Sequence, residues 1–154
     1  MSRITDHVDV DVPVRVAYDQ WTQFESFPEF MEGVERVIQL DDRTLDWTAS
    51  IGGKTKHWRA EIVQQEPDQV VSWRSLDGAR NDGTVRFEPT DANTTRVTLE
   101  LDVQPEGAIE SAGDALGVVD RRVKGDLDRF KDFIESRGQA TGAWRGSVEG
   151  RQVR

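Results

Sequence analysis

Few side chains in this sequence are suited to moving a proton. It contains two histidines, His7 and His57, one tyrosine, Tyr18, and no cysteine, which excludes disulfides and thiolate catalysis. A histidine exchanges a proton near neutral pH and so suits general acid–base chemistry. His57, however, falls on the polar row of its expected strand, which favours an exposed position. Tyr18 suits either a hydrogen bond into an internal cavity or the solvent side of its helix.

No motif in the sequence supports a metal or phosphate site. The two histidines lack the spacing of a zinc-binding helix. Gly53-Lys54-Thr55 has the form of the end of a phosphate-binding loop, but Thr48 stands where the earlier glycine is required, and the triplet falls at a hairpin. We therefore expect no metal and no cofactor.

Aromatic side chains share one side of four successive expected strands. They alternate with polar residues, as residues that face a protein interior do. They are Trp47, Trp58, Trp73 and Phe87. Two interpretations stay open: the rings fill a core, or they line a cavity of about 300–1,000 Å³, the usual size of a ligand site. Because a buried indole N–H needs a partner, several Trp in one lining imply polar groups or water inside.

The elements that would position these residues form an α+β domain. Residues 4–12 alternate as a strand, Pro13 precedes an amphipathic helix, and residues 24–31 predict a second short helix with a break before Pro28. Six more strands follow between residues 34 and 103, separated by turn signals. The last element is a long helix with an apolar residue every three or four positions. The order predicts a seven-stranded curved antiparallel sheet wrapped around that helix.

Length and charge limit the classes of function. The 154 residues fit one domain, and the net charge of −9 opposes binding to the phosphates of nucleic acids. We find no membrane span and no secretion signal, so we expect a cytoplasmic location. Apolar periodicity stops after Arg137. We therefore expect a folded domain over residues 1–137 and a flexible Gly/Arg-rich tail over residues 138–154.

Three segments carry a resemblance to a known superfamily. They are Val12-Pro13 before a helix, the corner Phe27-Pro28-Glu29-Phe30-Met31-Glu32-Gly33-Val34, and residues 122–131 of the closing helix. Over about residues 3–137 the chain resembles the START-like, helix-grip superfamily, also called SRPBCC, which includes Bet v-like plant allergens, aromatic polyketide cyclases and coenzyme-Q-binding proteins. The closing helix is similar to that of the bacterial cyclase/dehydrase-like and coenzyme-Q-binding branch. The resemblance implies a helix-grip fold and a START-like ligand-binding domain over residues 1–137.

The resemblance also implies where a ligand binds. It would enter between the short-helix corner and the strand loops, and rest against the long helix. The implied contacts are Phe27, Phe30 and Met31 at the mouth, Trp47, Trp58, Trp73 and Phe87 on the wall, and Leu116, Val119 and Val123 on the floor. Phe30 and Met31 suit equally well a hydrophobic staple that fixes the corner to the sheet.

Evidence for catalysis is weaker than evidence for a pocket. Cyclases of this superfamily use polar pocket residues, including an arginine on the strand before a Pro-Asp turn. Here that stretch is Val63-Gln64-Gln65-Glu66-Pro67-Asp68, and the nearest arginine, Arg59, falls on the polar row. Whether the protein is an enzyme therefore stays open, and a binding protein is favoured over a polyketide cyclase or dehydratase.

The leading hypothesis is that the protein binds a small hydrophobic molecule, such as a quinone, a lipid or a polyketide-like aromatic. A polyketide cyclase or dehydratase that uses polar pocket residues is the alternative. A second alternative is an interaction module that uses the basic tail. We expect transient membrane contact at most, and no nucleic-acid partner.

Overall fold

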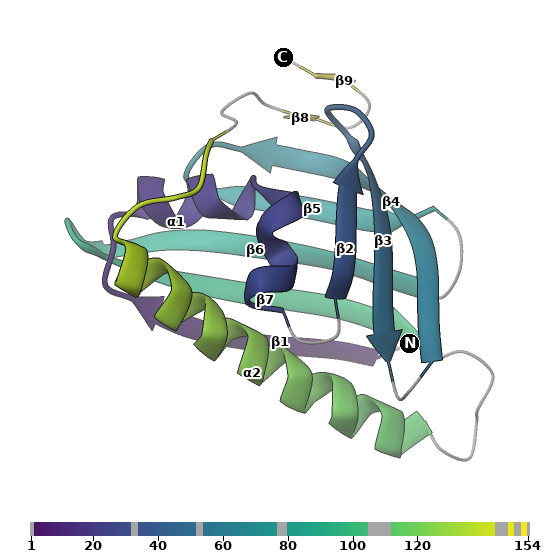
Figure 1. Ribbon diagram of the computed structural model, residues 1–154. Helices are drawn as coiled ribbons and strands as arrows, with labels where there is room; N and C mark the ends of the chain where they lie inside the picture. Colours follow the sequence, from purple (N-terminus) through teal and green to yellow (C-terminus); the bar gives the residue numbers. More distant parts are fainter. Residues whose placement is uncertain are drawn as a thin grey trace.

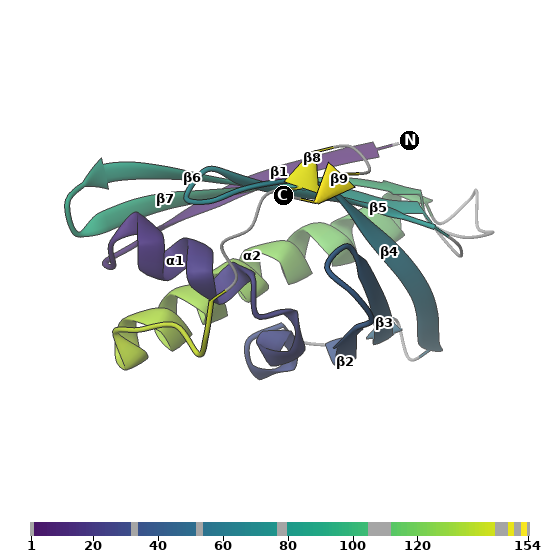
Figure 2. The same ribbon diagram turned by 90° about the horizontal axis from the view of Figure 1, so that it is seen from above.

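A bent antiparallel sheet forms the larger layer of the molecule (Figures 1 and 2). In this computed structural model, residues 2–31, 34–51, 54–76, 80–104, 112–143, 148–149 and 152–153 are described. The main strands are β1 (Ser2–Val10), β2 (Val34–Gln39), β3 (Thr44–Ile51), β4 (Lys54–Glu66), β5 (Val70–Ser75), β6 (Arg80–Asp91) and β7 (Thr94–Gln104), in the order β1-β7-β6-β5-β4-β3-β2. Two short strands, β8 (Val148–Glu149) and β9 (Gln152–Val153), add to the edge of β4.

Three helices cover the concave side of this sheet (Figure 2). They are α1 (Val14–Trp21), the 3₁₀ helix η1 (Phe24–Glu29) and the long α2 (Ala112–Arg137). α1 packs against β6 and β7, η1 against β2, and α2 against β1. The seven-stranded sheet around a C-terminal helix confirms the predicted helix-grip fold. The predicted break before Pro28 is wrong, because Pro28 lies inside the last turn of η1, where the helix ends one residue later.

The register of the sheet decides which side chains face the helices. Cross-strand partners in an antiparallel ladder point to the same face of the sheet. Trp47 pairs with Trp58, and Trp73 pairs with both Ile62 and Gly83. These residues belong to the inner rows, as predicted for the aromatic ones. Figure 2 shows that β2, β3 and the first part of β4 turn out of the plane of the other strands toward the helices, so the inner rows face one another across a bend.

The core is packed most tightly beside α1 and the end of α2. Val97 on β7 and Phe130 on α2 are completely buried, with 0% of their surface exposed. Slightly more surface remains on Leu101 of β7 and on Trp47 and Trp58, each 9% exposed, and Val123 in the middle of α2 is 5% exposed. No helix in the described ranges is long and apolar enough to cross a membrane.

Candidate functional site

A continuous chain of aromatic rings runs from η1 across the bend of the sheet to β4. The centroids of Phe27 and Phe30 lie 5.6 Å apart, and those of Phe27 and Trp47 lie 5.7 Å apart. Trp47 and Trp58 stack with centroids 5.8 Å apart and ring planes only 6° from parallel. This stack follows from the register, because the two residues are direct partners on the inner face. Four of the predicted contact residues therefore form one surface.

The other predicted contact residues are divided among separate places. Phe87 is buried against Tyr18 of α1, with ring centroids 5.4 Å apart, so Tyr18 lies inside and not on the solvent side of its helix. Val123 is buried on α2, and Met31 packs half-buried against the core. Leu116 and Val119 lie outside the residues whose side chains the structure describes.

Trp73 occupies its inner-row position because its neighbour has no side chain. The half-buried indole lies across Gly83, and a Cβ built on Gly83 would come within 2.3 Å of the ring. Only glycine leaves room for that ring on β6. The placement of the Trp73 ring thus depends on Gly83, which the alternation of aromatic residues along the strands does not reveal.

One polar residue of the inner face was missed by the sequence analysis. Gln65 is only 1% exposed, and it pairs with Val71 on the inner side of the sheet. Neither its amide nitrogen nor its amide oxygen has a hydrogen-bond partner in the described part of the chain. The alternation set by Trp58 and Ile62 would place Gln64 inside, but a register shift between Ile62 and Gln64 turns Gln65 inward and leaves Gln64 exposed. Single-sequence periodicity does not reveal such a bulge.

Two further polar groups face the interior. The indole N–H of Trp47 is buried without a hydrogen-bond partner among the described residues. Asp6 interrupts the inner row of β1, where it pairs with Leu99. One of its carboxylate oxygens accepts the backbone N–H of His7 at 2.8 Å, and the other, Oδ2, is buried with no hydrogen bond in the described ranges. Asp6 also lines a groove of about 200 Å³ beside Leu127 and other residues of α2. The interior thus contains both donors and acceptors.

The histidines do not contribute to this interior. His57 is exposed on the outer face of β4 and hydrogen bonds with Asp46 of β3, and His7 is exposed on β1. Arg59 also lies exposed on the outer row. Among the described residues no group of three or more His, Asp or Glu side chains is arranged to hold a metal ion.

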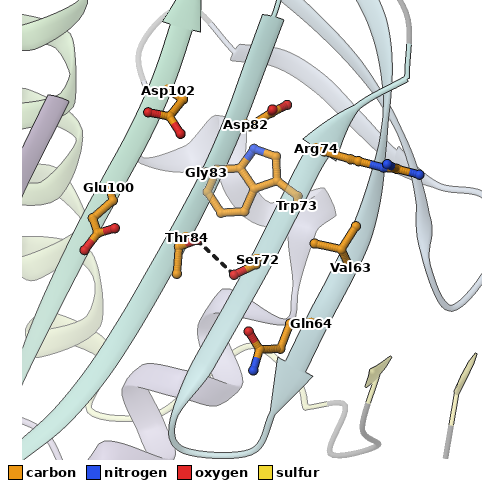
Figure 3. A pocket seen from close by; sticks show the side chains of 10 residues that line it. All are labelled: Val63, Gln64, Ser72, Trp73, Arg74, Asp82, Gly83, Thr84, Glu100 and Asp102. Atoms are coloured by element: carbon orange, nitrogen blue, oxygen red, sulfur yellow. Dashed lines mark hydrogen bonds between the residues drawn. The ribbon is translucent and has the colours of Figure 1, made fainter. Parts of the chain in front are cut away.

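A second concave feature lies on the outer face of the sheet (Figure 3). This pocket has a volume of about 510 Å³, and its lining residues are Val63, Gln64, Ser72, Trp73, Arg74, Asp82, Gly83, Thr84, Glu100 and Asp102. The hydroxyl groups of Ser72 and Thr84 hydrogen bond across its floor at 2.9 Å. Of the predicted contact residues only Trp73 belongs to the lining. Three carboxylates and several hydroxyl and amide groups make this pocket unsuited to an apolar ligand, which would desolvate them.

Comparisons with known proteins connect this architecture to a family. A family model described as polyketide cyclase/dehydrase and lipid transport matches residues 10–132. An uncharacterized 17.2 kDa protein of Streptomyces lincolnensis is 49% identical over 149 residues, which cover 96% of this chain and 99% of the relative.

Solved structures share the same fold. A protein of Deinococcus radiodurans is 28% identical, with a TM-score of 0.71, and the match covers 89% of this chain and 99% of that one. The Zhui aromatase/cyclase of Streptomyces sp. R1128 is 20% identical, with a TM-score of 0.76. The match covers 93% of this chain and 99% of that one. A START superfamily protein of Mycobacterium smegmatis is 13% identical, with a TM-score of 0.70 and coverage of 88% and 95%.

Proposed function

Because the chain belongs to the polyketide cyclase/dehydrase and lipid transport family, we propose that it binds a small hydrophobic molecule between the sheet and the first half of α2. The observation that carries this proposal is the connected set of four rings from Phe27 to Trp58 on the inner side of the sheet. Aromatic, apolar walls of this kind favour an apolar ligand that itself carries rings.

The interior suits such a ligand better than the outer pocket does. Its inner rows are mainly apolar, and the few polar groups on them, at Asp6, Gln65 and the Trp47 indole, are well separated along the chain. The outer pocket carries the carboxylates of Asp82, Glu100 and Asp102. An apolar molecule placed there would remove water from charged groups without replacing their hydrogen bonds.

The interior polar groups favour a ligand that also carries oxygen. The amide of Gln65 can both donate and accept, and the Trp47 indole N–H can donate. A carbonyl oxygen would accept from these donors, and a hydroxyl group would donate to the Gln65 oxygen. A quinone or a polyketide-like aromatic therefore fits these groups better than a hydrocarbon lipid chain does.

Native mass spectrometry of the gently purified protein, followed by solvent extraction, tests this proposal. We expect one hydrophobic, oxygen-bearing molecule per chain. The variant Trp58→Leu should lose most of it, because the stack with Trp47 is removed. His57→Leu is the matched control, since it changes the neighbouring residue on the outer face of the same strand. A ligand retained equally by both variants would contradict the proposed location.

A cyclase activity is the second candidate function, and two observations favour it. The fold is shared with an aromatase/cyclase, and Asp6 presents a carboxylate on the inner row of β1. In such a reaction Asp6 would accept a proton from carbon. The neutral amide of Gln65, on the strand before the Pro-Asp turn, cannot supply the positive charge of an arginine.

Incubation of the protein with a linear polyketide thioester distinguishes the two functions. If the protein is a cyclase, Asp6→Asn should abolish cyclization while the substrate still binds. If it is a binding protein, the natural chain should produce no more cyclized product than buffer does. The cytoplasmic location stays a prediction from the sequence.

A further inference from the structure

The chain beyond α2 returns across the helical corner formed by α1 and η1. We infer that residues 138–143, here named the C-terminal strap, hold this corner closed and control how fast a ligand enters and leaves the interior. This inference rests on the proposed function, because it concerns access to the same interior.

The strap begins at a sharp change of direction. Gly138 has a φ of +72°, in the left-handed region that favours glycine, and its N–H donates to the carbonyl of Ile134 at 2.8 Å. This cap ends α2 and turns the chain back. In Figure 1 the strap then runs from the end of α2 past α1.

Thr141 is the centre of the contact between the strap and the corner. Its backbone N–H donates to the Gln20 side-chain oxygen at 2.9 Å, and its hydroxyl accepts from the Gln20 side-chain nitrogen at 3.2 Å. The Ser26 hydroxyl of η1 lies 3.2 Å from the same Thr141 hydroxyl. Gln20 is completely buried, so its amide would lose these partners if the strap moved away. One threonine therefore connects the strap to both helices of the corner.

The short strand β8, which follows the strap in the sequence, pairs with the sheet. After the strap, β8 pairs with the end of β4, where Gln64 opposes Glu149 and Gln65 opposes Val148. The C-terminal part of the chain thus contacts α1, η1 and β4. These are the helical corner and the strand that provides the buried Gln65 amide.

The corner that the strap contacts carries part of the proposed binding surface. Phe27 of η1 is packed against Trp47 and is buried, so the corner must shift before a ligand can pass this pair. The described hydrogen bonds between the strap and the corner all involve one residue, Thr141, which is itself exposed. Water can replace such bonds, so the strap can detach without unfolding the core.

A reversible cross-link tests whether the strap controls access. The chain has no cysteine, so Gln23→Cys with Gly142→Cys introduces a single disulfide. These positions are adjacent, because a Cβ built on Gly142 would lie 2.5 Å from the Gln23 side-chain oxygen and 2.9 Å from its amide carbon. Cysteine side chains at these two positions therefore start close together, and a disulfide needs their Cβ atoms about 3.5–4.5 Å apart. Dissociation of the neutral fluorescent probe N-phenyl-1-naphthylamine is followed by stopped flow, with and without reductant.

We expect the oxidised variant to release the probe at least about tenfold more slowly than the reduced one, with little change in affinity, as for a closed gate. Failure of the disulfide to form would overturn the placement of the strap. Equal release rates in the two states would overturn the control of access. If the natural chain and both the oxidised and the reduced forms of the variant fail to bind the probe, the proposed function fails. The hydrogen-exchange measurement described next then still tests the contact between the strap and the corner.

A second variant tests whether the strap holds the corner, without any ligand. Thr141→Val keeps the size of the side chain and removes the hydroxyl that contacts Gln20 and Ser26. Amide hydrogen exchange over residues 14–30 should become roughly three- to tenfold faster, the effect of losing one or two net hydrogen bonds. Ser136→Ala is the control, because it removes an exposed hydroxyl that donates to the Phe133 carbonyl within α2. Unchanged exchange at the corner in Thr141→Val would overturn the inference.

Discussion

Replacement of Gln65 by methionine should make the protein more stable and weaken its hold on a ligand. Gln65 is 1% exposed, and neither polar atom of its amide has a hydrogen-bond partner among the described residues. A buried polar group without a partner costs about 1–3 kcal/mol. Methionine has nearly the same length and shape and needs no hydrogen bond, and volume-conserving swaps are well tolerated.

The expected gain in the free energy of unfolding is therefore about 1–3 kcal/mol in the ligand-free protein. For a chain of this size each kcal/mol raises Tm by about 2–4 °C, so Tm should rise by about 2–12 °C. The same substitution removes a donor and an acceptor from the interior, so retention of an oxygen-bearing ligand should fall. Gain of stability with loss of binding is the signature of a functional residue.

Calorimetry and urea unfolding of protein freed of ligand by solvent extraction provide the measurement. Gln64→Met is the matched control, because Gln64 is the adjacent residue on the exposed face. Its free energy of unfolding should change by less than about 0.5 kcal/mol. A lower Tm for Gln65→Met than for Gln64→Met would refute the reasoning, because it would mean that the amide makes stabilising hydrogen bonds in the folded protein.

Three further predictions concern the scaffold. Gly83→Ala should destabilise the protein by about 1–3 kcal/mol in urea unfolding, because the new Cβ would meet the Trp73 ring at 2.3 Å; an unchanged midpoint would mean that the ring moves aside freely. Burial raises the pKa of Glu135, but its hydrogen bonds, above all that from Lys131, outweigh this and lower the pKa below 4.5. The carboxylate therefore stabilises the fold above pH 4.5 and loses this effect as the pH falls through its lowered pKa. The urea midpoints of the natural chain and of Glu135→Gln should therefore differ at neutral pH, and this difference should disappear in acid. Gly138→Ala should cost about 1–2 kcal/mol because φ is +72°, and a loss of less than about 0.5 kcal/mol would show that the turn adapts.

Much of the fold was predictable because its signals are local. The period of two in the strands and the three-to-four spacing in α2 report which side of each element is apolar. Trp47, Trp58 and Val123 were correctly assigned to the interior on that basis, and His57 to the exposed row. The long helix and seven alternating strands then leave few ways to cover both apolar faces, and the helix-grip arrangement is one of them.

The candidate site was less predictable because it depends on where elements meet. The bulge in β4 reverses the alternation after Ile62, so Gln65 and not Gln64 faces inward. Phe87 shares the inner face with Trp47, yet it packs against Tyr18 and not with the other rings, because α1 covers β6. Position along a strand does not report which helix lies above it.

By itself, the sequence determined the elements and the buried face of each, because these follow from periodicity and composition. Only the tertiary structure decided which rings touch, which glutamine is buried and where the chain beyond α2 returns. These depend on strand register, on the bend between the two parts of the sheet and on the turn at Gly138. The register and the bend are set by packing between residues far apart in the chain, for which a single sequence carries no local signal. The turn at Gly138 is a local helix cap, but the contacts that the chain makes after it depend on tertiary packing.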